Sequence, residues 1–234
     1  MPTETLPSPA LYRLMSWLSP SFPVGAYAYS HGLEFAVEDG RVTDAAALSR
    51  WVEAVMQFGA GRNDGIFFAA AWRAVDDDSQ EDFLEIAEMA AAYRGTKELA
   101  LENEAQGAAF LDAVAAAWSS ARFEEYAPMF KASGFPVSYP IAVALAAAAS
   151  DVSLSAALSA YLHAFAANLI SAGVRLIPLG QTAGQQVLAG LQYTVLDAAM
   201  IAQTHTLDDL GSAAPMVDWA SVKHETQYTR LFRS

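Results

Sequence analysis

The sequence predicts an all-α protein, a single helical bundle of roughly eight to eleven helices. Apolar residues recur at the spacing of one helix face, as Leu11, Leu14, Met15 and Leu18 do near the start of the chain. Alanine is abundant, and the alternation of β-branched and polar residues that is typical of strands is nearly absent. Neither an internal repeat nor a long linker divides the chain. Residues 1–234 are therefore expected to form one domain, with 212–234 as a C-terminal tail that can be flexible.

Capping and breaking residues divide this bundle into its expected elements. Helices are predicted at 11–18, at about 29–37, from 43 or 44 to 58, from 63 or 64 to 75, and at about 80–93, 97–119, 140–149, 153–174 and 180–205. A loop that contains Pro128, Gly134, Pro136 and Pro140 separates the two halves. In the helix over 97–119, the pattern predicts that Glu98, Glu102 and Asp112 face water.

Composition limits the function classes. Hydrophobic residues make up 54% of the chain, which is enough for a packed core. The net charge of −13 repels phosphate backbones, so nucleic acid is not expected as a partner. The absence of cysteine excludes disulfides and thiolate metal sites, and fits a reducing compartment. The N-terminal sequence MPTETLPSPALYRL does not have the pattern of a signal peptide, and we expect a cytoplasmic protein.

Charged residues are almost missing from one long region. Between Ala132 and Leu196, only Asp151 and Arg175 carry a charge. Helices without charges are either central in a bundle or face another protein, and the pattern leaves both alternatives open. The stretch from Val152 to Val174 is long enough to span a bilayer. It contains several serines, His163 and Asn168, and basic or aromatic flanks are missing, so a buried helix is predicted and no membrane contact is expected.

The sequence contains no recognisable catalytic motif. Neither the GxxxxGK[ST] phosphate loop nor HExxH nor GxSxG occurs. His31 and Glu34 are interpreted as a solvated pair, and His163 as a hydrogen-bonded core residue. We therefore expect no catalytic residue, no cofactor and no metal site. The alternative class is a helical enzyme with a small-molecule pocket in its core, but the carboxylates and histidines that would converge there are missing from the pattern.

Three segments resemble the UreF family of urease accessory proteins. Residues 19–34 read SPSFPVGAYAYSHGLE, residues 168–182 read NLISAGVRLIPLGQT, and residues 225–234 read ETQYTRLFRS. Their order and spacing fit the family over essentially the whole chain. The resemblance implies a non-enzymatic helical homodimer that binds UreD (UreH in some systems) and with it recruits the GTPase UreG to apo-urease. In this family the protein is held to couple or gate GTP hydrolysis to nickel insertion.

The resemblance also implies partner-binding residues within these segments. They are Phe22, Pro23, Gly25, Tyr27, Ser30 and Glu34 in the first, Arg175, Gln181, Thr182 and Gln185 in or just after the second, and Tyr228, Arg230, Leu231 and Phe232 in the third. For each segment a structural alternative stays open. The aromatic residues of the first can be tucked inside the bundle, Arg175 can cap helix carbonyls, and the tail can pack on its own domain. We expect the tail to order when UreD binds, with Arg230 reaching the loop around Tyr27.

Overall fold

The computed structural model describes residues 8–234 and confirms the predicted all-α fold, since these residues form helices and no strand. Residues 1–7, on which the expected absence of a signal peptide partly rests, lie outside the described residues. The α-helices are α1 (Ser8–Trp17), α2 (Leu33–Glu38), α3 (Ala45–Phe58), α4 (Ala60–Asp76), α5 (Gln80–Ala92), α6 (Lys97–Ala117), α7 (Ala121–Ala132), α8 (Tyr139–Ala148), α9 (Leu154–Leu176), α10 (Gln181–Gly190), α11 (Gln192–Thr204) and α12 (Pro215–His224). Two short 3-10 helices, η1 (Ala26–Ala28) and η2 (Leu207–Asp209), complete the elements.

Helix α8 lies at the centre of the bundle. Every residue from Pro140 to Ala148 is buried, and the helix packs against α4, α6, α7 and α9. Small alanine side chains let these helices approach closely. The close approach of α6 also requires Gly107, where a Cβ atom would lie 2.1 Å from the Val137 carbonyl oxygen. The lack of charge in α8 therefore reflects a central position, the first of the two alternatives.

Helix α9 is long and apolar enough to cross a membrane by length and composition alone. It packs against α2, α3, α4, α8, α10 and α11, and half of its most apolar window is buried inside the protein. The helix therefore has the position of a core helix of the bundle. His163 lies on its exposed side, so the expectation of a core histidine was wrong.

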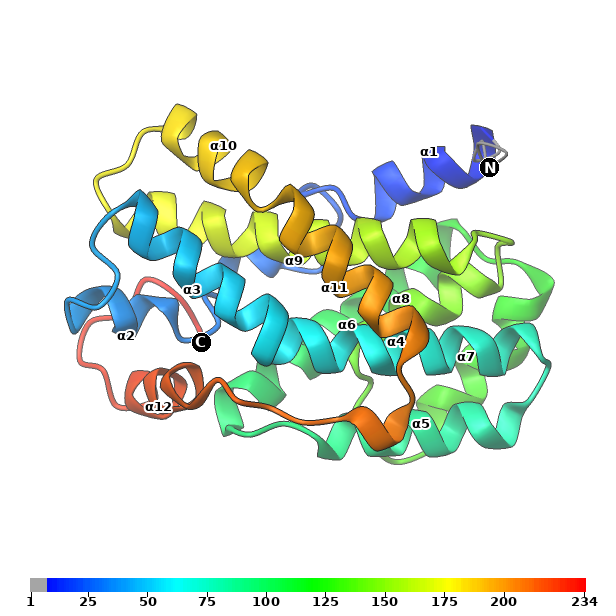
Figure 1. Ribbon diagram of the computed structural model, residues 1–234. Coiled ribbons are helices and arrows are strands. Elements are labelled where there is room, and N and C mark those ends of the chain that lie inside the picture. The colour runs from blue at the N-terminus through cyan, green and yellow to red at the C-terminus, as the bar shows by residue number, and fades with distance from the viewer. Residues whose placement is uncertain (1–7) are drawn as a thin grey trace.

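Helices α10 and α11 run across the outside of α9 and α3 (Figure 1). The sequence predicted one helix over 180–205, but the chain turns at Leu191, whose buried side chain anchors the junction. The outer face of α11 exposes three apolar residues at helical spacing, Tyr193, Leu196 and Met200. Unlike α8, this pair of helices carries uncharged residues on an exposed surface, so a central position does not explain their lack of charge. That they face another protein stays a prediction.

Three further expectations about the elements were wrong. The helix expected from residue 29 begins at Leu33, because His31 and Gly32 both have positive φ angles, 57° and 76°. The expected loop around Pro128 contains α7, which Ser120 caps and whose buried Phe123 and Phe130 outweigh the loss of one backbone donor. The tail without an apolar stripe contains α12, which begins with a proline at its first position.

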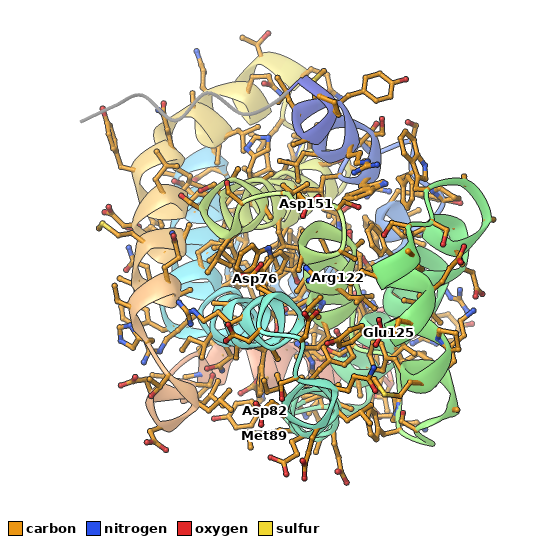
Figure 2. All side chains as sticks on the ribbon, turned by 90° about the vertical axis from the view of Figure 1, so that its right-hand side faces the viewer. Asp76, Asp82, Met89, Arg122, Glu125 and Asp151 are labelled. Atoms are coloured by element: carbon orange, nitrogen blue, oxygen red, sulfur yellow. The ribbon has the colours of Figure 1, made fainter. Side chains whose placement is uncertain are left out.

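The charged residues at one end of the bundle are exposed, and the carboxylates at the other end are buried. Figure 2 shows the end at which α5, α7 and the end of α4 meet, with Asp76, Arg122 and Glu125 labelled near its surface. At this end Arg122 pairs with Asp78 at 3.0 Å, and Gln80 donates to Glu125 at 2.6 Å; these contacts are partly or fully exposed. At the other end the C-terminal residues close over buried carboxylates. That end contains most of the residues of the candidate site.

Candidate functional site

Two chain segments meet at one end of the bundle. We call residues 18–32 the N-terminal loop and residues 225–234 the C-terminal strap. The strap runs from α12 to α2, and Figure 1 places the C-terminus between these helices. The backbone N–H of Ser30 donates to the carbonyl oxygen of Ser234 at 2.9 Å, and that of Arg233 donates to Ala28 at 2.8 Å. The strap therefore pairs with the loop, and all of these residues belong to the segments that the sequence analysis singled out.

The carboxylate of Glu34 binds the strap through hydrogen bonds. It accepts the backbone N–H groups of Leu231 at 2.6 Å and Phe232 at 2.9 Å. Its second oxygen also lies 3.0 Å from Nε2 of His224, the last residue of α12. Glu34 is only 6% exposed, so its bonds to Phe232 and His224 are shielded from water, and its bond to Leu231 is partly so. One side chain of α2 thus fixes both the strap and α12.

Glu98 of α6 completes the cluster. One of its carboxylate oxygens lies 2.7 Å from Nδ1 of His224, and the other accepts from Nη1 of Arg230 at 2.9 Å. His224 has no exposed surface, and the Glu98 side chain is 8% exposed. We call Glu34, Glu98, His224 and Arg230 the ionic cluster. Buried charges are tolerated only when they are paired and hydrogen-bonded, and each carboxylate here has at least two partners.

Glu102 lies one turn further along α6 and binds the chain terminus. The hydroxyl of Ser234 donates to its carboxylate at 2.6 Å, and Nδ1 of His31 lies 3.5 Å away. Burial by itself raises the pKa of Glu102, but the charge of His31, the bonds from His31 and Ser234 and the charge of Arg94 more than offset it. The pKa of the Glu102 carboxyl is therefore lower than its ordinary value. The carboxylate is ionised at neutral pH.

The prediction that Glu98 and Glu102 face water was therefore wrong, as was the interpretation of His31 and Glu34 as a solvated pair. All four residues are buried, because the strap and α12 cover them. Among residues 8–234, no three histidine or carboxylate side chains lie in a group that could hold a metal ion. The chemistry that the cluster can perform is the binding of a chain segment through charged hydrogen bonds.

A cavity of about 240 Å³ lies under the N-terminal loop. Apolar side chains such as Trp17 and Phe22 form part of its wall, and buried polar groups form the rest. Among these, Arg94 pairs with Asp64 at 2.8 Å, and the hydroxyl of Tyr161 donates to the same carboxylate at 3.2 Å. These contacts join α4, the end of α5 and α9 beneath the loop.

Arg175 links the second segment to the other two. Its Nη1 donates to the carbonyl oxygen of Tyr27 at 2.7 Å, and its Nε donates to Ser171 within α9 at 3.3 Å. The guanidinium also lies 4.3 Å from the ring centre of Phe232, a cation–π contact. Arg175 thus bonds a carbonyl of its own helix, as one alternative expected, and also supports the loop and the strap.

The predicted site residues divide into an exposed and a buried group. The exposed group comprises Pro23, Tyr27, Arg175, Gln181, Thr182, Gln185, Tyr228, Arg230 and Leu231. The buried group comprises Ser30, Glu34 and Phe232, with Phe22 half-buried against Phe110. Gly25 has a φ of 70° and begins η1, a turn that favours glycine. Ser30 and Glu34 hold the backbone of the strap, which carries the exposed Tyr228, Arg230 and Leu231.

Sequence reasoning missed His224, Glu98, Glu102 and Ser234, the polar partners of this site. It also expected Arg230 to reach the loop around Tyr27, but Arg230 binds Glu98, and Arg233 and Ser234 reach the loop. The spacing of Glu98 and Glu102, one helical turn apart, was the available signal, because it places both on one helix face. Nothing in the pattern indicated that α12 would cover this face.

The fold and this arrangement define an all-helical bundle protein in which a C-terminal strap closes over a buried ionic cluster. The sequence profile of the UreF family matches residues 42–192. The chain is 49% identical to the urease accessory protein UreF of Granulibacter bethesdensis over 233 residues, 100% of this chain and 98% of that protein. It is 50% identical to the UreF of Rhodopseudomonas palustris over 225 residues, 96% and 93% of the two chains. For the UreF of a Bradyrhizobium species the identity is 48% over 229 residues, 98% and 94% of the two.

The chain therefore belongs to the UreF family. This confirms the resemblance that the three sequence segments indicated. Because the proteins of this family are accessory proteins, the chain is not an enzyme. The single-domain organisation, the flexibility of residues 212–234 in solution and the partner-binding roles of the site residues stay predictions.

Proposed function

We propose that this urease accessory protein acts in urease maturation as an adaptor. Together with UreD, called UreH in some systems, it recruits the GTPase UreG to apo-urease and couples or gates GTP hydrolysis to nickel insertion. The sequence contains no phosphate loop, so the hydrolysis is assigned to UreG. We propose the cytoplasm as the place of this reaction, with neither nucleic acid nor a membrane as a partner.

One observation carries this proposal. Exposed aromatic and apolar side chains are held on a backbone that buried charged groups fix in place. Tyr27 is 69% exposed, Leu231 is 65% exposed and Tyr228 is fully exposed. Exposed aromatic residues are frequent anchors of protein interfaces, and an ordered backbone lowers the entropy that binding must overcome. The exposed Gln181, Thr182 and Gln185 extend this surface beyond Arg175 with uncharged polar groups.

We also propose that two copies of the chain form a homodimer through the outer face of α11. Each copy carries a net charge of −13, so two copies repel one another, and a contact between them costs least at an uncharged surface. Tyr193, Leu196 and Met200 supply such a surface, with Asp197 as the only charged neighbour on α11. The variant Leu196→Glu is expected to convert the dimer to a monomer, measured by light scattering. A dimer that persists in this variant places the contact elsewhere.

The first experiment is size-exclusion chromatography with light scattering on the chain alone and mixed with its cognate UreD. We expect a stable complex, which is lost when residues 230–234 are deleted. The substitutions Tyr228→Ala and Leu231→Ala are sharper tests, because both side chains are exposed and their loss leaves the buried contacts of the strap intact. Each is expected to weaken binding by tenfold or more, about 1.4 kcal/mol.

The matched control is Met89→Ala. Met89 is an exposed apolar residue of α5, 43% exposed, and is labelled in Figure 2; it belongs to none of the three segments that form the candidate site. This variant is expected to bind UreD as the unmodified chain does. If the wild-type chain forms no complex with UreD, the adaptor function is wrong. If the strap variants and Met89→Ala bind equally well, the partner binds another surface.

A further inference from the structure

The outer face of α11 carries apolar residues at the spacing of a helix–helix contact. Tyr193, Leu196 and Met200 recur at intervals of three and four residues, and all three are exposed. In coiled coils, apolar residues at this spacing form the seam between two helices. Helices α3, α4 and α9 pack against α11, and the residues of α11 that this packing buries are Val195 and three alanines. The outer face is therefore a seam that the chain's own packing leaves exposed.

The two ends of this seam have complementary shapes. Near its start, Tyr193 is the largest side chain of α11 and is 75% exposed. Near its end, four residues at positions i, i+3, i+4 and i+7 are exposed: Asp197, Met200, Ile201 and Thr204. Four residues at this spacing surround a hole that accepts one side chain of a facing helix. We call them the α11 hole. Asp197 and Ile201 also line a groove of about 700 Å³ between α11 and the end of α3, which deepens the hole.

We propose that two copies of the chain pair through antiparallel α11 helices, and that Tyr193 of each copy inserts into the α11 hole of the other. Side chains of a helix lean toward its N-terminus, so Tyr193 leans away from the hole of its own chain. An antiparallel partner presents its tyrosine at the opposite end, over the hole. A parallel partner would place the two tyrosines together and leave both holes empty. This inference rests on the proposed homodimer and specifies its geometry.

Charge favours a second copy as the occupant of the hole. Asp197 is the only charged residue of α11, and Arg62 lines the same groove, so a positive side chain accompanies the carboxylate at the contact. The phenol O–H of Tyr193 can donate to the carboxylate of Asp197 in the other copy, a charge-assisted hydrogen bond. Two-fold symmetry makes each of these contacts twice, as in other interfaces where a surface binds its own copy.

The antiparallel arrangement fixes which residues meet. If Tyr193 lies opposite Met200, the two-fold axis passes between Leu196 and Asp197. The two copies of Leu196 then lie at nearly the same level. The two copies of Tyr193 are separated by about 10 Å along the helix axes, because each residue adds about 1.5 Å. A disulfide needs Cα atoms within about 7 Å of one another, so cross-linking distinguishes these positions.

The test uses cysteine variants, because the chain contains no cysteine of its own. On mild oxidation, Leu196→Cys is expected to form a covalent dimer by itself, detected by non-reducing electrophoresis. Tyr193→Cys and Met200→Cys are each expected to remain uncross-linked alone. Mixed together, with a size tag on one of them, these two variants are expected to give a cross-linked heterodimer. The matched control is Met89→Cys on α5, which is also exposed and should not cross-link.

A parallel pair would give the opposite pattern. Tyr193→Cys and Met200→Cys would then each cross-link to their own copy and not to one another, which overturns the proposal. If the wild-type chain is a dimer by light scattering but Leu196→Cys does not cross-link, the contact lies elsewhere and the proposal is also wrong. A monomeric wild-type chain overturns the homodimer itself. Because UreD is absent from these experiments, none of these outcomes removes the adaptor function.

A dilution series measures how much Tyr193 contributes to the dimer. Tyr193→Ala is expected to raise the dissociation constant about tenfold or more, since buried aromatic anchors dominate protein interfaces. Tyr193→Phe keeps the ring and loses only the O–H, so it should raise the constant less. Met89→Ala is expected to leave it unchanged. An unchanged dissociation constant in Tyr193→Ala would show that this side chain does not enter the hole.

Discussion

The two ends of the bundle use the same types of charged residue with opposite degrees of burial. In the ionic cluster, the side chains of Glu34, Glu98 and His224 are at most 8% exposed. At the other end, Arg122 and Asp78 pair at a similar distance with side chains 33% and 71% exposed. Exposed ion pairs contribute about 0–1 kcal/mol, because water screens them and the long side chains lose entropy. The comparison indicates that burial, and not the number of ion pairs, decides which charges hold this protein together.

The largest expected loss of stability follows the removal of one buried carboxylate of the ionic cluster. Glu34→Ala leaves Nε2 of His224 and two strap N–H groups without their carboxylate partner, and is expected to lower the free energy of unfolding by about 3–5 kcal/mol. Guanidinium denaturation followed by fluorescence measures this change. The control is Glu85→Ala on α5, an exposed glutamate, which should change the same quantity by about 0.5 kcal/mol or less. A loss of less than about 1 kcal/mol in Glu34→Ala would contradict the role given to the cluster.

A smaller loss of stability is expected when an uncharged hydrogen-bonding group beside the strap is removed. The buried hydroxyl of Ser30 donates to the Ser234 carbonyl and accepts the N–H of Glu34 at 3.2 Å. Ser30→Ala is expected to cost about 1–3 kcal/mol, because two buried groups lose a partner. Ser16→Ala removes a comparable hydroxyl-to-carbonyl bond in an exposed position of α1 and should cost clearly less. Equal losses in the two variants, measured by thermal unfolding, would mean that burial at the strap contributes nothing.

The pH dependence of Glu102 gives a third test. Since the folded-state pKa of Glu102 is lower than its ordinary value, its ionised form stabilises the fold at neutral pH. This contribution is fully present above the unfolded-state pKa of about 4.3 and is lost as the pH falls through the folded-state value. Unfolding temperatures of the wild type and Glu102→Gln should therefore differ at pH 7 and converge below about pH 4. Parallel curves would show that Glu102 is not the group responsible.

The smallest loss of stability is expected at the end of the bundle where the ion pair of Arg122 and Asp78 is exposed. Arg122→Ala should lower the free energy of unfolding by about 1 kcal/mol or less, and the loss should shrink further in high salt. Denaturation at low and high ionic strength measures both. A loss as large as that of Glu34→Ala would remove the distinction between the two ends of the bundle.

The fold was predictable because most helices follow from local chemistry. Asp44 caps α3 by accepting the N–H of Ala47 at 2.8 Å, as the sequence indicated, and α9 follows its apolar composition. Helices α7 and α12 were missed, because a proline inside the first and a weak apolar stripe in the second concealed them. Tertiary packing against α5 and α8, and against α2 and α6, overrides these local signals.

The candidate site was predictable only in part. Its three segments are recognisable as motifs, since their proline, glycine and aromatic residues are set by local backbone geometry. The exposure of Tyr27 and Tyr228 and the burial of Phe232 do not follow from those motifs, because exposure depends on what the rest of the chain covers.

The sequence by itself determined the helical class, the acidic and cysteine-free character, and the family to which the chain belongs. Only the tertiary structure decided which carboxylates lie in water and which hold the C-terminal strap. The physical reason is sequence separation. His224 lies 190 residues from Glu34 and 126 from Glu98, so no local pattern relates them. Their meeting depends on how α12 packs on α2 and α6, a property of the whole core.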